Sequence, residues 1–310
     1  MEESLQQNNN ELDVIRAPSS VSFSHSDREQ GPRLEAELLF SGGVAVLFRG
    51  KDRDYQIEIY RSGCTKDGFL GLPEYSGLEE IVRGLYLGIY PDRDRDLSIA
   101  RMKQGLSHPR TILELVRYEG VPVGFGIFPR LLVSGEPVVY SSRAFELEHE
   151  GQGLGTHVLK EAIRLHQESL AKSHRSLRWG ALMTQNALSV LTLQKIPMVE
   201  IDYPFRRLFS EDREAQSLML GVHREVYLSS LSIDTTTGVS RGELRELGMN
   251  EAYRPNRDHQ KAWAIHQRMV SLPPHGFGMN REAGDVVYVL FKLRKPNFAD
   301  TSVAFLPEAA

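Results

Sequence analysis

The chain has 310 residues, of which 41% are hydrophobic and 25% are charged, and its formal net charge at pH 7 is −4. These values are ordinary for a globular protein, and they give no overall attraction to nucleic acid. Cys64 is the single cysteine, which excludes an intrachain disulfide, and no apolar run approaches the ~20 residues that span a bilayer, so we expect a cytoplasmic protein with no nucleic-acid or membrane partner.

The N-terminal segment differs in composition from the rest. Residues 1–33 are rich in Asn, Gln, Ser and Glu and contain few large apolar residues. Such a segment buries too little surface to offset its ordering entropy, which predicts a disordered tail. We expect a single domain over residues 34–310. Residues 34–48 suggest a hairpin around Gly42-Gly43, and the strict alternation of residues 55–60 predicts a strand.

The elements that follow are predicted from hydrophobic spacing and turn signals. In chain order, we predict helices over residues 78–90 and 97–106, strands over 112–118, 122–132 and 138–147, a helix over 154–171, a strand over 177–183, a helix capped by Asn186, a strand over 198–203, helices over 211–228 and 257–272, and a strand over 285–293.

A glycine-rich loop separates the strand over 138–147 from the helix over 154–171. Glycines at this position let the backbone turn tightly and approach a ligand closely. A helix that opens on such a loop leaves main-chain N–H groups unpaired and adds a partial positive charge of roughly half a unit. We therefore expect a phosphate or pyrophosphate to bind at Gly151, Gln152, Gly153, Leu154, Gly155 and Thr156.

Three phosphate-loop patterns compete for this segment. The P-loop requires a lysine after its last glycine, but Gly155 is followed by Thr156 and His157. The dinucleotide fingerprint would need a third glycine where Thr156 stands. The third pattern, Arg/Gln-x-x-Gly-x-Gly/Ala before a helix, fits from Glu150 to Gly155 at every position except the first. In this respect the loop resembles motif A of the GNAT superfamily, the acyl-CoA-dependent N-acetyltransferases.

A second segment supports the same resemblance. Asn186-Ala187-Leu188-Ser189, followed by Leu193-Gln194-Lys195-Ile196-Pro197-Met198, is similar to motif B of that family. The resemblance implies an α/β fold with a mixed, mostly antiparallel sheet, flanked by helices, whose fourth and fifth strands splay apart. It implies a core over about residues 55–204, a helical insertion over about 205–283, and a final strand over about 285–294. We expect this last strand to pair with residues 198–203.

The resemblance also implies a function. It predicts acetyl-CoA as the acyl donor, with its pyrophosphate on the glycine loop and its pantetheine arm between the splayed strands. The main-chain N–H groups of Phe145 and Leu147 would contact the acyl carbonyl and the arm, and Asn186 would lie on the motif B side. The acceptor would be a small-molecule or peptide amine, transfer would be direct, and no metal is expected. The oligomeric state stays open.

Two departures from the family pattern bear on activity. Glu150 stands at the Arg/Gln position, where a carboxylate facing the pyrophosphate would repel it by roughly 4 kcal/mol at 4 Å and an effective dielectric near 20. Leu193 stands where many family members have the tyrosine that protonates the departing thiolate. These departures favour an alternative, a catalytically silent CoA-binding or interaction module on the same fold.

Direct transfer needs a base that takes the proton of the amine. Glu146 and Glu148 are the candidates, on alternating positions of the predicted strand and so on one face. Glu146 is preferred because it lies further inside the predicted cleft. With Leu193 at the tyrosine position, either solvent or Tyr203 would protonate the thiolate.

Two further patterns resemble motifs of other functions, a hydrolase and a zinc site. Gly238-Val239-Ser240-Arg241-Gly242 matches the nucleophile elbow of hydrolases, although a capping box between Ser240 and Glu243 explains it better. His149-Glu150 begins like a zinc motif and His259 and His266 share a helix face, but neither pair has a third ligand.

Overall fold

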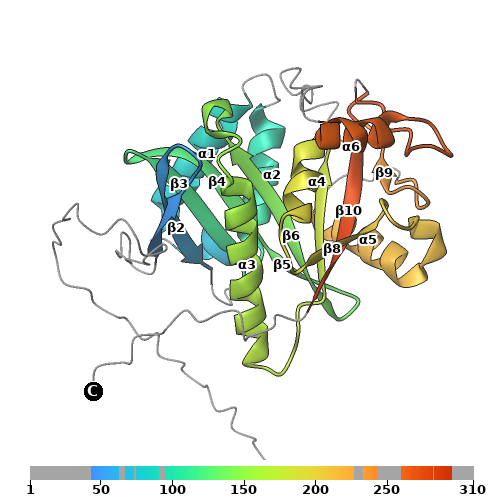
Figure 1. Ribbon diagram of the computed structural model, residues 1–310. Helices are drawn as coiled ribbons and strands as arrows, with labels where there is room; N and C mark the ends of the chain where they lie inside the picture. The colour runs from blue at the N-terminus through green and yellow to red at the C-terminus, as the bar shows by residue number, and fades with distance from the viewer. Residues whose placement is uncertain are drawn as a thin grey trace, which may run out of the picture.

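The computed structural model describes residues 43–62, 67–72, 75–90, 95–226, 233–242, 260–281 and 283–294 (Figure 1). The predicted tail over residues 1–33 and most of the predicted hairpin over 34–48 lie outside this part of the chain.

A mixed sheet runs through the described residues, with neighbouring strands in the order β1-β2-β3-β4-β6-β7-β10-β8. Every pair in it is antiparallel except β6 and β7, as the predicted fold class requires. The strands are β1 (Val44–Arg49), β2 (Asp54–Arg61), β3 (Ile112–Tyr118), β4 (Val121–Phe128), β5 (Arg130–Val133), β6 (Glu136–Phe145), β7 (Trp179–Thr184), β8 (Val199–Tyr203), β9 (Val239–Ser240) and β10 (Val286–Leu293).

The sheet begins one strand earlier than predicted. β1 pairs with β2, from Val44 opposite Ile59 to Arg49 opposite Asp54, so the core does not start at residue 55. The tight turn between these strands is closed by the Gly50 N–H, which donates to the Arg53 carbonyl over 2.8 Å. The alternation of β1 is weak because Val44 and Leu47 are exposed, which explains why this strand was not placed in the core.

One predicted strand is in fact two. Residues 122–132 divide into β4 and β5 at Pro129, whose ring removes a backbone donor from the ladder. β5 pairs with the first half of β6, and β4 pairs with its second half. The change of partner lets β6 bend as it passes from one neighbour to the next.

The predicted divergence of two central strands is confirmed. β6 and β7 run parallel and pair from Val138 opposite Trp179 to Ser141 opposite Leu182. Beyond Ser141, β6 pairs with β4, and β7 continues against β10. The two strands therefore part at Ser141 and leave main-chain groups facing the gap.

The predicted pairing of the last strand is also confirmed. β10 runs antiparallel to β8, from Leu290 opposite Tyr203 to Leu293 opposite Val199. Its other edge pairs with β7, so β10 lies between two strands that precede it by about a hundred residues. The segment between β8 and β10 thus leaves the sheet and returns to it.

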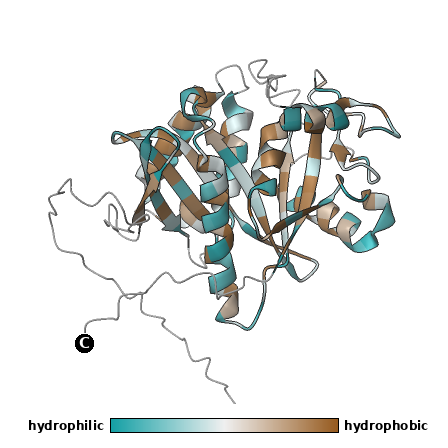
Figure 2. Cartoon of the chain, in the orientation of Figure 1, coloured by the Kyte–Doolittle hydropathy of each residue, from teal (hydrophilic) through white to brown (hydrophobic). Residues whose placement is uncertain are grey.

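The helices cover both faces of the sheet (Figure 1). They are α1 (Ser76–Ile89), α2 (Arg95–Ser107), α3 (Leu154–Ala171), α4 (Ala187–Gln194), α5 (Arg213–Val226) and α6 (Gln260–Val270). α1 and α2 pack on one face, α3 and α4 on the other, and the segment after β8 adds α5 beside α2 and α6 beside α4. In Figure 2 the strands are largely hydrophobic, as expected for a sheet covered on both sides.

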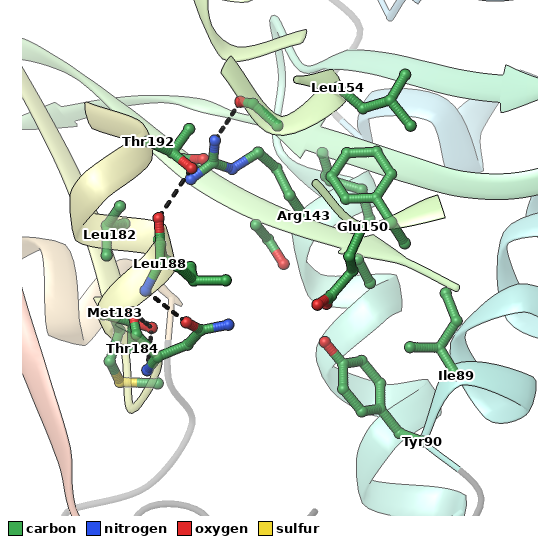
Figure 3. A pocket seen from close by; sticks show the side chains of 18 of the residues that line it. Ile89, Tyr90, Arg143, Glu150, Leu154, Leu182, Met183, Thr184, Leu188 and Thr192 are labelled. Atoms are coloured by element: carbon green, nitrogen blue, oxygen red, sulfur yellow. Dashed lines mark hydrogen bonds between the residues drawn. The ribbon is translucent and has the colours of Figure 1, made fainter. Parts of the chain in front are cut away.

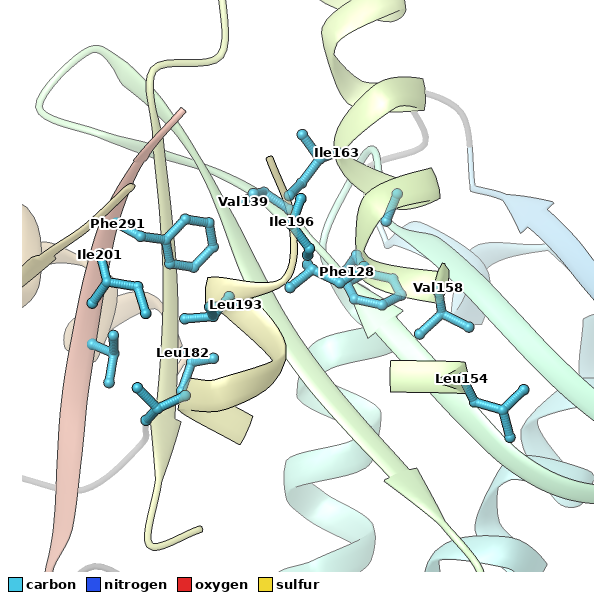
Figure 4. Close-up of a cluster of buried hydrophobic side chains, with 14 of the residues drawn as sticks. Phe128, Val139, Leu154, Val158, Ile163, Leu182, Leu193, Ile196, Ile201 and Phe291 are labelled. Atoms are coloured by element: carbon cyan, nitrogen blue, oxygen red, sulfur yellow. The ribbon is translucent and has the colours of Figure 1, made fainter. Parts of the chain in front are cut away.

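The largest buried cluster lies between the sheet and α3, α4 and α6. The apolar face predicted for α3 is the face that is buried, and Figure 4 shows Leu154, Val158 and Ile163 close to Phe128 of β4. Leu193 of α4 joins the same cluster and is fully buried. This packing fixes where α3 begins, and with it the glycine loop.

Candidate active site

A cavity of about 990 Å³ opens where β6 and β7 part. Its size is typical of small-molecule sites, which range over roughly 300–1,000 Å³. Both faces of the sheet contribute to its walls. They include Tyr90 and Gln104 from α1 and α2, Ser141–Phe145 from β6, residues 146–151 and 153–156 of the loop and the start of α3, Leu182–Thr184 from β7, Asn186, and Leu188, Thr192 and Lys195 from α4.

The glycine loop is built as a cradle of main-chain N–H groups. Gly151 and Gly153 have φ of +79° and +88°, a region that side chains disfavour, which explains the two glycines. Within the described part of the chain, the N–H groups of residues 151–155 donate to no other group. The Thr156 N–H already donates to the Gly153 carbonyl over 3.1 Å, so Thr156 offers its hydroxyl instead.

The turn and the second strand of the first hairpin hold this loop through one main-chain and one side-chain group. The Gln152 Oε1 accepts a hydrogen bond from the Asp52 N–H over 3.0 Å, so only the main chain of Gln152 is left to contribute to the cradle. The His149 ring is 5% exposed, and its Nδ1 lies 3.1 Å from the Tyr55 hydroxyl. The sequence pattern gave His149 no such role, because its partner lies 94 residues away.

Arg143 brings a positive charge beneath the loop. It projects from β6 toward the start of α3, where its guanidinium donates to the Gly155 carbonyl (Figure 3). Burial lowers the pKa of Arg143 to about 10, which still leaves the group charged at neutral pH. Glu114, two strands away across Gly126, is fully buried, and burial raises its pKa well above its ordinary value. Burial therefore favours the uncharged form of the Glu114 carboxyl, which weakens its pairing with Arg143.

The main chain of β6 turns alternate N–H groups into the gap. The N–H groups of Tyr140 and Glu146 donate to Pro129 and Val123, toward β4 and β5. Alternation therefore directs the N–H groups of Arg143 and Phe145 toward the side that β7 has left. The contact of the Phe145 N–H with a donor stays a prediction, and the structure adds Arg143 as a second candidate.

The strand that was predicted to end at Leu147 ends two residues earlier. β6 ends at Phe145, and Leu147 opens a short 3₁₀ turn, Leu147–His149, with 68% of its surface exposed. The ladder closes at the Glu146 N–H, after which the chain leaves the sheet. Leu147 still lines the cavity, and the contact expected for its N–H stays a prediction.

The two candidate bases lie at the mouth of the cavity. Glu146 and Glu148 both line it and both are exposed. They are not alternating positions of a strand, because Glu146 immediately follows β6 and Glu148 is inside the 3₁₀ turn. Glu146 lies closer along the chain to the point of divergence, which keeps it the better placed of the two.

Glu150 turns away from the loop that it precedes. In Figure 3 its carboxylate points toward Tyr90 of α1 on the opposite wall. Desolvation raises the pKa of the Glu150 carboxyl, in keeping with a position inside the cavity. The repulsion expected between this side chain and a bound pyrophosphate is reduced by that orientation.

The motif B side is formed by α4. The Asn186 Oδ1 accepts a hydrogen bond from the Leu188 N–H over 2.7 Å, so Asn186 caps α4 as predicted. Leu193 lies in the core and does not line the cavity. Tyr203 is also buried, and its hydroxyl donates to Asp212 Oδ2 over 2.5 Å, so the expectation that Tyr203 reaches the thiolate is wrong.

The structure gives no support to the hydrolase and zinc patterns in the described residues. Ser240 is fully buried on β9, which pairs with β10, so it is neither on an exposed elbow nor a helix cap. Glu243 and His259 lie outside the described residues. Among the residues that are described, no three His, Cys, Asp or Glu side chains gather as a metal site would require. None of the described helices combines the length and the apolar character needed to span a bilayer.

Comparison with known proteins gives distant structural similarity. No protein-family model matches the chain, and no curated protein matches its sequence. The GNAT acetyltransferase from Streptococcus pneumoniae is 16% identical with a TM-score of 0.31, over 47% of this chain and 85% of that one. The GNAT domain of S. lividans PAT is 11% identical with a TM-score of 0.38, over 53% and 92%. The aminoglycoside acetyltransferase AAC(6')-Iy, in complex with a CoA bisubstrate analogue, is 17% identical with a TM-score of 0.34, over 46% and 89%.

The activity therefore has to be argued from the site itself.

Proposed function

We propose that the protein is an N-acyltransferase that moves an acetyl or other short acyl group from acyl-CoA to an amine. The observation that carries this proposal is the cavity along the divergence of β6 and β7, with a loop of free N–H groups at one end. An acyl-CoA matches that combination, because it is a long thioester with an anionic pyrophosphate and an arm that carries amide groups.

The donor would lie along the gap from the loop toward Ser141. Its pyrophosphate would accept hydrogen bonds from the N–H groups of residues 151–155, supported by the helix dipole of α3 and the charge of Arg143. The amides of its arm would pair with the main chain of Phe145 and Arg143, as an added strand does. Asn186 would face the arm from the start of α4.

The chemistry follows from that placement. The amine would enter past α1 and α2, and Glu146, or Glu148, would take its proton. The amine nitrogen attacks the thioester carbonyl carbon, and main-chain N–H groups of β6 stabilise the oxyanion that forms. The carbon–sulfur bond then breaks, its electron pair leaves with sulfur as a thiolate, and the amide is released.

A matched pair of glycine variants tests the donor site. Gly153→Ala and Gly135→Ala both place a side chain at positive φ, +88° and +85°, which costs roughly 1–2 kcal/mol. Gly153 lines the cavity and Gly135 lies in the β5–β6 turn outside it. By calorimetric titration we expect Gly153→Ala to weaken acetyl-CoA binding about tenfold or more, as the loss of one or two charged hydrogen bonds would. Gly135→Ala should bind as the wild type does, and equal affinities for all three proteins would contradict the proposed donor site.

The second candidate function is a CoA-binding module without catalysis. Leu193 favours it, because a leucine in the core supplies no proton at the position of the family tyrosine. A thiol-release assay with acetyl-CoA over a panel of small amines and peptides separates the two. Release that depends on an amine supports the transferase, and tight CoA binding without release supports the module.

The acceptor class stays broad in this proposal. The wall formed by α1 and α2 carries tyrosines, an arginine and a histidine, and the mouth carries Glu146, Glu148 and Glu150. Small-molecule and peptide amines both fit such a mixed surface. We place the reaction in the cytoplasm and assign it no metal.

A further inference from the structure

We propose that the Ser141 hydroxyl donates a hydrogen bond to the sulfur of the donor as the thioester breaks, and so stabilises the departing thiolate. This inference rests on the proposed acyltransferase function. It assigns the stabilisation of the thiolate to a serine of β6, because Leu193, at the position of the family tyrosine, is an apolar residue in the core.

Ser141 carries a buried hydroxyl that is not paired. The residue is 5% exposed, and its Oγ has no hydrogen-bond partner among the described residues. Leaving a buried hydroxyl without a partner is unfavourable, since the group has lost its water and gained nothing in return. Ser141 also lines the cavity, so a ligand there can supply the missing partner.

Its position in the sheet is the closed end of the gap. Ser141 opposite Leu182 is the last pair that joins β6 to β7. An arm that enters beside Phe145 passes four residues of β6, about 13 Å at 3.3 Å per residue, before it meets this point. The thioester is at the far end of such an arm, so the sulfur would stop near Ser141.

The side chain is on the correct face. Val139 packs in the cluster beneath α3 and α4, and Arg143 projects toward α3. Because side chains alternate along a strand, Ser141 shares that face with both of them. Its cross-strand neighbour Leu182 also lines the cavity.

The two threonines that line the cavity on β7 and α4 are already committed to other partners. Thr192 donates to the Leu188 carbonyl over 2.9 Å, and Thr184 donates to the Asn186 carbonyl over 3.2 Å. Tyr203 donates to Asp212 outside the cavity. Ser98 of α2 has a buried, unpaired Oγ as Ser141 does, but it is not in the cavity wall.

The step conserves atoms and charge. The amine nitrogen bonds to the acyl carbon, the carbon–sulfur bond breaks, and its electron pair goes to sulfur. The amine proton goes to Glu146, and the Ser141 proton stays on its oxygen while it bonds to the thiolate. A serine hydroxyl is far less acidic than a thiol with a pKa of about 8.5, so it stabilises the anion without protonating it. Water protonates the sulfur afterwards.

The test measures the affinity that the protein gains from the thiolate itself. Affinities of CoA and of desulfo-CoA, which has no thiol to ionise, are compared by titration from below to above the ordinary thiol pKa of about 8.5. We expect wild-type protein to gain affinity for CoA relative to desulfo-CoA as the pH rises. In Ser141→Ala that gain should shrink about 10- to 100-fold, the effect of one hydrogen bond to a charged group.

Two controls separate this role from a structural one. Ser141→Thr keeps a hydroxyl and should keep most of the gain, and Ser98→Ala removes a matched buried hydroxyl and should change nothing. The same gain in Ser141→Ala as in wild type, with CoA bound by both, would overturn the role of Ser141 and leave the donor site intact. A wild-type protein that binds neither ligand would overturn the proposed function together with this inference.

Discussion

At the scale of single residues, the candidate site contains two kinds of group. Some belong to a local sequence motif, and others are identified only from the pairing of strands and loops in the structure. The three glycines of the loop lie within five consecutive residues and have an evident physical purpose, so they could be predicted. Arg143, His149 and Ser141 could not. Each acquires its role from a strand or loop that is distant in sequence.

Glu146 gives the first prediction at this scale. Replacing it with glutamine keeps the size of the side chain but removes the carboxylate that we propose as the base for the amine. General-base catalysis contributes about 10²- to 10⁴-fold, so we expect kcat of Glu146→Gln to fall within that range. Its affinity for acetyl-CoA should stay within about twofold of wild type, because Glu146 pairs with no group of the proposed donor site.

Glu148→Gln is the matched control, since Glu148 also lines the cavity and is also exposed. Steady-state rates with one amine acceptor decide between the two carboxylates. A large loss in Glu148→Gln with normal turnover in Glu146→Gln would transfer the role to Glu148, and normal turnover in both would remove this pair from the mechanism.

At the scale of elements, long periodic segments were predicted well and strand ends were not. The helix over residues 154–171 was predicted with its observed bounds because its apolar residues recur at helical spacing and form one buried face. The break at Pro129 and the end of β6 at Phe145 were missed, because each depends on which strand lies opposite. The predicted strand therefore ran two residues too far, and Leu147 lies in a 3₁₀ turn instead.

Arg143 also acts between elements, since it ties β6 to the first turn of α3. Arg143→Met keeps the length of the side chain but removes both the bond to the Gly155 carbonyl and the charge beneath the loop. Hydrogen bonds of charged groups contribute roughly 1.5–3 kcal/mol, so we expect CoA and acetyl-CoA affinities to fall about tenfold or more, and by equal factors.

Arg175→Met provides the comparison. Arg175 also donates to a glycine carbonyl, that of Gly135, over 2.7 Å, but it does so on the surface and outside the cavity. Calorimetric titration of both variants measures the difference. Wild-type affinity in Arg143→Met would show that the cradle holds its ligand without this cation.

At the scale of the whole molecule, the sheet is a scaffold in which buried titratable groups set the pH range of stability. His166 of α3 is 2% exposed, and its Nε2 lies 2.9 Å from the Phe128 carbonyl. Burial is the main reason that its pKa falls from 6.5 to about 3. Glu114 is shifted in the opposite direction, so its contribution is lost as pH rises, whereas that of His166 is lost as pH falls.

His166 therefore yields a prediction about acid unfolding. Between pH 6.5 and about 3 the unfolded chain binds a proton at His166 that the folded protein does not bind, so stability decreases as the pH falls through this window. The loss attributable to His166 is on the order of 4 kcal/mol at the lower limit. His166→Gln keeps a side-chain N–H for the Phe128 carbonyl but does not titrate, and it should flatten this part of the profile. Urea unfolding at a series of pH values measures it, with exposed His174→Gln as control. A profile for His166→Gln as steep as that of wild type would show that the buried imidazole does not limit stability in acid.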